Sequence, residues 1–249
     1  MSDIKKQIAN HRSIRKYRSE PIPDDILRQI LEAGICASNT GNMQVYSMIV
    51  TKDEDLRKQL WDVHFRQNMV LQAPVHITFC ADVNRFSKWC RARDAEPAYE
   101  NLLWFCTAAV DATLASQNVV LAAESFGLGI CYLGTAIYNA DRIIDILQLP
   151  KGVIPVTALV MGYPDEQPPL TGRLPLKSVV HEETYHNFTN EEIDNLYAEL
   201  EATEQTRQLL EINQKETLAQ VFTDKRYTKK DNEAISAAYL EVMKKQGFL

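Results

Sequence analysis

The stretch from Thr107 to Gly129 constrains the fold more than any other part of this chain. It reads TAAVDATLASQNVVLAAESFGLG, which predicts a long helix rich in alanine and leucine with glycine at its end. Most faces of this helix are apolar, so most of its surface has to be covered. The covering layer is either the core of the same domain or a second subunit, and the residues alone leave both alternatives open.

Shorter segments predict the elements around this helix. Apolar runs rich in β-branched residues predict three buried strands and a fourth strand that enters a glycine turn, at residues 45–51, 75–81, 153–164 and 130–136. Amphipathic patterns predict helices at residues 21–38, 141–150, 189–203 and 231–246. Because strands and helices alternate irregularly along the 249 residues, they predict a mixed α+β or three-layer α/β fold.

A cluster of basic residues, HRSIRKYR, stands out at His11–Arg18 because the whole chain has a net charge of −6. Such a cluster suits a nucleic acid, a membrane surface or one small anion, and it is also typical of a solvated edge that pairs with nearby acids. The acidic balance argues against DNA, RNA and anionic lipid as main partners. Arginine offers a planar fork of donors that suits phosphate oxygens, so a small phosphate-bearing ligand is the functional alternative.

Several widespread functional motifs are absent from the sequence. No G-x-G-x-x-G follows a predicted strand, no P-loop, H-E-x-x-H or G-x-S-x-G occurs, and the five histidines form no recognisable metal set. We therefore expect no metal ion. His76 alternates within a predicted strand, and we expect it to be a hydrogen-bonded structural residue.

Cysteine usage and the amino-terminal residues bear on the compartment. The five cysteines are odd in number and lack C-x-x-C spacing, which favours a reducing cytosol over a disulfide framework. Apolar neighbours predict burial for four of them, namely Cys36, Cys80, Cys106 and Cys131. The start, MSDIKKQIAN, lacks the apolar region of a signal peptide, and no uncharged run reaches the length of a membrane span. We expect a cytoplasmic protein without a membrane partner.

Four segments carry a resemblance to a known family. In order they are HRSIRKYRSEPIPDDILRQILEAGICASNTGNMQ from His11, AAESFGLGICYLG from Ala122, LPLKSVVHEETY from Leu174 and MKKQGF from Met243. From about residue 8 to residue 249, the chain resembles the nitroreductase superfamily of flavoproteins. It is most similar to the branch of oxygen-insensitive, NADPH-dependent nitroreductases and their flavin-reductase relatives.

The resemblance implies a fold and an assembly. The fold is α+β with three layers, in which helices flank a central mixed, mainly antiparallel sheet. Residues 1–249 are expected to form a single FMN-binding domain, and a carboxy-terminal extension, about 188–249, is expected to wrap the partner in an intertwined homodimer. Each subunit then contributes to two FMN sites at the dimer interface, and the second chain covers part of the apolar helix.

The resemblance also carries site residues onto this chain. The expected FMN-binding residues are His11, Arg12, Ser13, Arg15, Asn39, Asn42, Gln67, Tyr132, Leu133, Gly134, Thr135 and Arg173. Arg15 is expected at the N1 and C2 carbonyl edge of the flavin ring, where reduction builds negative charge. Asn39 and Gln67 are expected to hydrogen-bond the flavin, and Asn42 to belong to the loop presented to the partner's flavin. Gly134 would let the backbone approach the ring near N5.

Two positions depart from the family pattern. Close relatives carry lysine two residues before the phosphate-binding arginine, where this chain has Thr171 before Arg173. Arg207 matches a mobile-loop arginine that contacts the 2′-phosphate of NADPH in relatives, but Ile212 stands where a second arginine is expected. The choice between NADPH and NADH therefore stays open, and Arg207 is equally compatible with a solvated helix charge.

The implied activity is the reduction of nitroaromatics, quinones or flavins by NADPH or NADH, with FMN passing hydride in two-electron, ping-pong steps. No catalytic side chain is expected, since the cofactor supplies the chemistry and solvent or bound water supplies protons. Two alternatives remain: a dedicated flavin reductase or dehalogenating relative, and a non-catalytic flavin-binding or nucleotide-sensing dimer. The expected partners are a second copy of the chain and small electron acceptors, not nucleic acid.

Overall fold

The structure is a computed structural model that describes residues 4–249. Contacts within the chain divide it into two compact units. The first comprises the residues up to Pro169 together with Ala237–Leu249, and the second comprises Leu170–Ser236. All of the expected site residues belong to the first unit except Arg173 and Arg207, which belong to the second.

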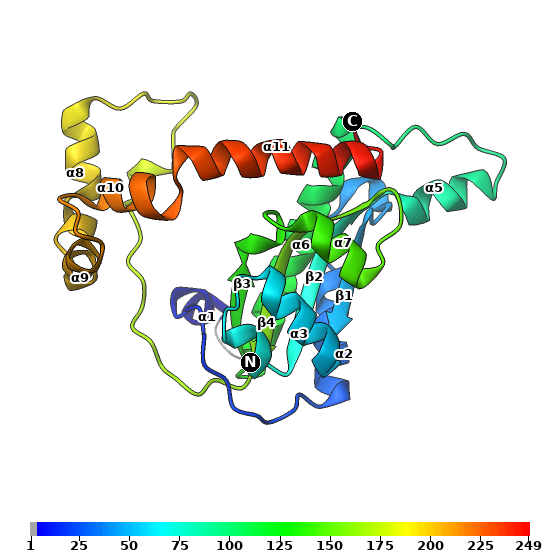
Figure 1. The fold of residues 1–249 in the computed structure, drawn as a ribbon, viewed down its shortest axis with the longest axis horizontal. Coiled ribbons are helices and arrows are strands. Elements are labelled where there is room, and N and C mark those ends of the chain that lie inside the picture. The colour runs from blue at the N-terminus through cyan, green and yellow to red at the C-terminus, as the bar shows by residue number, and fades with distance from the viewer. Residues whose placement is uncertain (1–3) are drawn as a thin grey trace. The chain divides into compact units, whose positions relative to one another are not determined.

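A four-stranded antiparallel sheet with the strand order β1-β2-β4-β3 forms the centre of the first unit (Figure 1). Its strands are β1 (Tyr46–Thr51), β2 (Val75–Asp82), β3 (Gly129–Leu133) and β4 (Val153–Gly162). Next to β3, the amino-terminal segment adds a parallel bridge between Ser13 and Ile130. The sheet is therefore mixed and mainly antiparallel, which confirms the predicted fold class and the four predicted strands.

Helices cover both faces of this sheet, because alternate side chains of each strand point to opposite faces. Leu159 and Met161 of β4 pack with α2 (Asp24–Ile35) and α6 (Leu102–Ser125) in one core cluster. Ala158 and Val160 of the same strand belong to a second cluster, which contains residues of α3 (Glu54–Val63), α4 (Met69–Gln72) and α7 (Ala140–Leu147). The result is the three-layer arrangement that the sequence predicted.

Helix α6 is the apolar helix of the sequence, shifted toward the amino terminus by several residues. It begins at Leu102 because the Asn101 side chain accepts a hydrogen bond from the backbone N–H of Trp104 at 3.1 Å. It ends at Ser125, and Gly127 then takes a φ of 76° before the chain enters β3. The predicted range, 107–129, was therefore wrong at both ends.

The two faces of α6 differ in what covers them. Its inner face buries small residues at helical spacing, Ala108, Ala112, Ala115, Val119 and Ala123 among them. Its outer face exposes Leu103, Val110 and Leu114, which are 70%, 57% and 43% accessible. The length and composition of α6 also meet the criteria for a membrane span, but the core helix of a globular protein meets them too. Core packing thus accounts for one apolar face and leaves the other without a cover in the single chain.

The first unit also contains α1 (Ile4–Ala9), α5 (Asn84–Arg91) and, from Ala237 on, the end of α11 (Lys229–Gln246). The second unit contains α8 (Asn190–Glu201), α9 (Glu204–Asn213), α10 (Leu218–Val221) and the start of α11 (Lys229–Gln246). Helix α8 begins with the predicted capping box, in which the side chains of Thr189 and Glu192 bond each other's backbone N–H. The cysteine prediction was wrong at Cys36 and Cys106, which are exposed.

Candidate functional site

The basic cluster is an extended segment docked onto β3. The backbone N–H of Ile14 donates to the carbonyl of Ile130 at 2.8 Å, and the buried Tyr17 hydroxyl donates to the carbonyl of Ile14 at 2.6 Å. Ile14 itself is buried against Gly129, where a side chain would collide with it. Since neighbours in an extended segment point to opposite sides, Ser13 and Arg15 lie on the more accessible side.

Glu166 holds the backbone of this segment in place. One of its carboxylate oxygens accepts hydrogen bonds from the backbone N–H groups of Arg15 at 2.5 Å and Lys16 at 3.1 Å. Within residues 4–249, the Arg15 guanidinium has no hydrogen-bond or ion-pair partner of its own. The segment thus presents an exposed cation on a backbone that is tied down at both ends.

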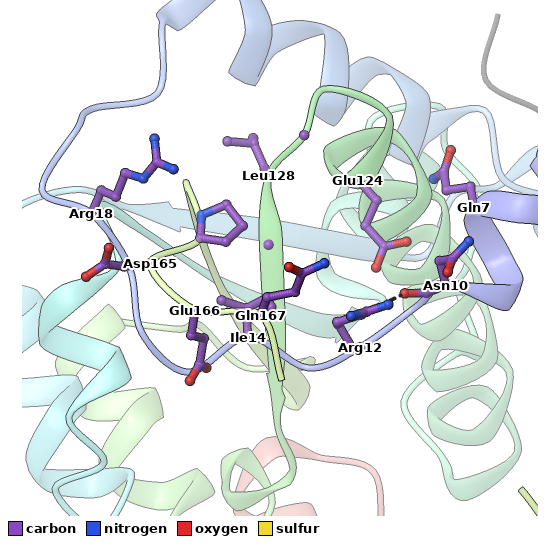
Figure 2. Close-up of a pocket in the computed structure, with 13 residues that line it drawn as sticks. Gln7, Asn10, Arg12, Ile14, Arg18, Glu124, Leu128, Asp165, Glu166 and Gln167 are labelled. Atoms are coloured by element: carbon purple, nitrogen blue, oxygen red, sulfur yellow. Dashed lines mark hydrogen bonds between the residues drawn. The ribbon is translucent and has the colours of Figure 1, made fainter. Parts of the chain in front are cut away.

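Arg12 lines a surface hollow of about 630 Å³, and His11 contacts Glu124, another residue that lines it (Figure 2). The His11 Nδ1 lies 2.6 Å from a carboxylate oxygen of Glu124, and the Arg12 guanidinium donates to the carbonyls of Asn10 and Pro168 at 3.2 and 3.0 Å. Of the expected FMN residues, only Arg12 lines this hollow. Because three acids line it beside two arginines, we do not assign a phosphate to it.

The second expected flavin segment, Tyr132–Thr135, runs from the end of β3 into a turn. The Tyr132 hydroxyl lies 2.8 Å from Ser116 Oγ of α6, and Leu133 is buried in the core cluster with α3 and α7. Gly134 is exposed, and a Cβ atom placed there would meet nothing within 4 Å. The backbone at Gly134 therefore offers open surface onto which a flat ligand can pack.

Gln67 and Thr135 are brought together by His64, which the sequence analysis did not single out. The Gln67 amide donates to the carbonyl of His64 at 3.0 Å, and His64 Nδ1 lies 2.6 Å from Thr135 Oγ1. His64 Nε2 lies 3.2 Å from Nε2 of His76, which confirms that His76 is a hydrogen-bonded structural residue. Burial lowers the pKa of His64 to about 4 and the pKa of His76 well below its ordinary value.

The loop that carries Asn39 and Asn42 is fastened to α6 by a buried carboxylate. Asp111, which is 1% accessible, accepts hydrogen bonds from the Thr40 backbone N–H at 3.0 Å and the Thr40 hydroxyl at 3.2 Å. Gln44 links the two asparagines, since its backbone N–H donates to Asn39 and its amide donates to Asn42. In the described part of the chain, hydrogen bonds from this loop reach α5, α6 and the loop itself. They do not bring it to the segments around Arg15 and Gly134.

The two expected site residues of the second unit, Arg173 and Arg207, make only local contacts. The Arg173 guanidinium donates to the carbonyls of Thr171 and Gly172 at 3.1 and 3.3 Å. Arg207 forms an ion pair of 2.5 Å with Glu204, one turn earlier in α9, and its side chain is 67% accessible. Ile212 is also exposed. The phosphate-binding roles of Arg173 and Arg207 stay predictions.

The first unit therefore combines groups of several chemical kinds. Arg15 supplies a cation, Ser13 a hydroxyl, Gln67 and Thr135 polar groups tied to one histidine, and Gly134 open backbone surface. Such a set can hold a flat, electron-rich ring that carries hydrogen-bonding edges. Among residues 4–249 there is no group of three or more side chains suited to a metal ion.

Comparison with known proteins gives the same family along most of the chain. A family model described as "Nitroreductase family" matches residues 8–163. An FMN reductase (NAD(P)H) of Bacillus subtilis (strain 168) is 36% identical over 198 residues, which cover 75% of this chain and 76% of the relative. An oxygen-insensitive NADPH nitroreductase of Salmonella typhimurium is 36% identical over 185 residues, 74% of this chain and 75% of the relative.

The fold is shared with solved structures as well. The crystal structure of a protein from Bacteroides fragilis NCTC 9343 superposes with a TM-score of 0.97 at 49% identity, covering 98% of this chain and 99% of the other. The family model matches more than half of the residues. The Bacillus subtilis relative is more than 30% identical over three quarters of the chain. The chain belongs to the nitroreductase family, as its sequence predicted.

Proposed function

We propose that the protein is an FMN-dependent NAD(P)H oxidoreductase that reduces nitroaromatics, quinones or flavins by two-electron, ping-pong hydride transfer. The observation that carries this proposal is the family match over residues 8–163, which contains every expected FMN residue except Arg173. The names of the relatives bear out the expected class of activity: FMN reductase using NAD(P)H, and NADPH nitroreductase.

The residues of the first unit fit FMN. The open surface at Gly134 leaves room for a ring against the backbone, and the Arg15 guanidinium has no competing partner among residues 4–249. Ser13 and Gln67 add a hydroxyl and an amide to the same unit. These are the groups that a ring with polar edges and a phosphate tail requires.

When bound, FMN supplies the transfer of hydride from a reduced nicotinamide to the acceptor. The chain holds and tunes the cofactor. Arg15 provides a cation whose backbone Glu166 keeps in place, and a fixed cation stabilises negative charge that develops on a reduced ring. The Gln67 amide and the Thr135 hydroxyl are hydrogen-bonding groups for the polar edges of the cofactor. No side chain is assigned as an acid or base, and protons come from solvent or bound water.

We further propose a homodimer in which each subunit completes the other's flavin site. The exposed apolar side of α6, with Leu103, Val110 and Leu114, supports it, because a stable apolar helix face is normally covered. The loop of Asn39 and Asn42 then serves the partner's flavin, and residues 188–249 wrap the partner as an extension of a single domain. The dimer is cytoplasmic and acts on small molecules, without nucleic acid or membrane.

A second candidate lies within the same chemistry. One relative is named an FMN reductase. Free flavin should therefore be tested as an electron acceptor beside nitroaromatics and quinones. Steady-state rates with FMN, menadione and one nitroaromatic distinguish the two roles. A dedicated flavin reductase turns over FMN far faster than the other acceptors.

The test of the proposed function uses the purified full-length chain. It should bind FMN, sediment as a dimer, and lose flavin absorbance at about 450 nm when NADPH or NADH is added without oxygen. A protein that binds FMN but does not bleach with either nicotinamide is a flavin-binding dimer and not an oxidoreductase. A protein that takes up no FMN and sediments as a monomer contradicts the proposal as a whole.

A further inference from the structure

His64 joins two segments of the proposed flavin surface. Its backbone carbonyl accepts a hydrogen bond from the Gln67 amide at 3.0 Å, and its Nδ1 lies 2.6 Å from Thr135 Oγ1. Its other ring nitrogen, Nε2, lies 3.2 Å from Nε2 of His76. One residue at the end of α3 is thus tied to the turn after β3 and to the middle layer of the fold.

These hydrogen bonds run from the interior to the surface. His64 and His76 are both 0% accessible, Thr135 is half-buried, and its neighbour Gly134 is exposed. The hydroxyl of Thr135 is therefore the outer end of a polar chain whose inner members are sealed from solvent. Gly134, next to it, is the open point of the proposed flavin surface.

The tautomers of the two histidines depend on each other. Burial lowers the pKa of both imidazoles, so both rings are neutral at pH 7, and each carries one N–H and one lone pair. Two Nε2 atoms at 3.2 Å can form a hydrogen bond only if one of them is protonated and the other is not. The ring with a bare Nε2 must then carry its proton at Nδ1, so His64 and His76 are opposite tautomers.

This chain of groups ends inside the protein. The Nδ1 atom of His76 is buried and has no hydrogen-bond partner among the residues that the structure describes. No side chain or backbone group among residues 4–249 is placed to exchange a proton with this far end. The hydrogen bonds of the two histidines are instead placed to orient Thr135.

We propose that His76, His64 and Thr135 form a positioning triad that holds the Thr135 hydroxyl and the Gln67 amide in the orientation that FMN requires. The inference rests on the proposed function, since it takes Gly134 and Thr135 as part of the flavin surface. The triad acts through geometry: His76 orients the ring of His64, that ring fixes the Thr135 hydroxyl, and the His64 backbone carbonyl holds the Gln67 amide.

Three variants test the triad by titration with FMN. Thr135→Val removes the hydroxyl with little change in shape, and it should weaken FMN binding by about tenfold and alter the visible spectrum of the bound flavin. Thr135→Ser restores a hydroxyl and should stay within about twofold of the wild type. Thr78→Val is the matched control, because Thr78 is a fully buried threonine on β2 whose hydroxyl has no partner among residues 4–249. It should bind FMN as the wild type does.

A second measurement needs no cofactor. Nitrogen-15 NMR of the flavin-free protein should show two buried neutral imidazoles of opposite tautomer, one protonated at Nδ1 and one at Nε2. Two imidazoles of the same tautomer, or a charged one at pH 7, would overturn the triad.

The outcomes separate this inference from the proposed function. A wild-type protein that binds FMN, with Thr135→Val binding it equally well and with the same spectrum, refutes the positioning role and leaves the proposed function intact. A wild-type protein that binds no FMN refutes the proposed function and the positioning role together. In that case the NMR measurement still decides whether the hydrogen-bonded chain exists.

Discussion

Two glycines five positions apart on the same stretch of chain, Gly129 and Gly134, should respond in opposite ways to one substitution. At Gly129, an added Cβ atom would lie 2.5 Å from Cγ1 and 2.7 Å from Cβ of Ile14. At Gly134, it would meet nothing within 4 Å, and the backbone there does not have the positive φ that excludes alanine. The pair Gly129→Ala and Gly134→Ala therefore separates the packing of the amino-terminal segment from the approach of a ligand.

The magnitude at Gly129 follows from what holds Ile14. Normal contact requires Ile14 to retreat by roughly 1 Å, and overpacking of this kind costs about 1–3 kcal/mol. Ile14 is also tied to Ile130 by a hydrogen bond of 2.8 Å, and losing it adds about 1 kcal/mol. We expect Gly129→Ala to lower the free energy of unfolding by about 2–4 kcal/mol, which corresponds to a Tm lower by roughly 5–15 °C.

Gly134→Ala should leave the flavin-free protein as stable as the wild type, or more stable by up to about 1 kcal/mol, because alanine restricts the unfolded chain. The same methyl group should intrude between the backbone and the flavin, so we expect FMN affinity to fall by about tenfold or more. Denaturant unfolding without FMN and equilibrium titration with FMN measure the two effects. Unchanged FMN affinity in Gly134→Ala would refute the approach of the ring to this turn. Equal stability of the two variants would refute the packing of Ile14.

Three further predictions concern charge and protonation. Arg15→Ala should slow flavin reduction by NADPH, because a fixed cation favours the reduced ring, and stopped-flow bleaching checks it; normal turnover with a lowered Tm would show a merely structural role. Arg207→Ala should raise KM for NADPH and leave KM for NADH unchanged, and an equal rise for both coenzymes would exclude reading of the 2′-phosphate. Folded His64 and His76 have lowered pKa values, so between pH 6.5 and 5.0 only the unfolded chain gains their protons. As the pH is lowered through this range, the free energy of unfolding should fall with a slope that grows to about 1.4 kcal/mol per pH unit for each histidine, and a flat profile in denaturant melts of the flavin-free protein would contradict this.

Elements with a clear local signal, such as a continuous apolar run or a helix cap, could be predicted from the sequence. Strand β4 was recognised from its continuous apolar run, and α8 from its capping box. The ends of α6 were misplaced, although Asn101 is a good amino-terminal cap, because the apolar run that defined the helix starts later. Helices α1, α3, α4, α5, α9 and α10 were not predicted; α5, for example, has the short and mostly polar sequence NRFSKWCR. Apolar neighbours along the chain also could not tell that Cys106 lies on the outer side of α6.

The candidate site was accessible to sequence reasoning only in part. The motif around Arg15 and the turn at Gly134 were found through a family resemblance, because neither has a period or spacing that reveals a flavin. His64 was missed because its role arises from a contact with Thr135, 71 residues away, and from a second histidine on β2. Contacts between distant residues leave no local pattern in the sequence. Only the fold brings such residues together.

Asp111 couples the position of the loop of Asn39 and Asn42 to the position of helix α6. Its carboxylate bonds the loop to the inner side of α6, while Leu103, Val110 and Leu114 lie on the outer side of the same helix. In the proposed dimer, an outer-side substitution that shifts or tilts α6 would also move Asp111 and the loop bonded to it. In that dimer, the subunit contact at the helix and the flavin contact at the loop are coupled through Asp111, so variants at either place should be assayed for both FMN affinity and subunit affinity.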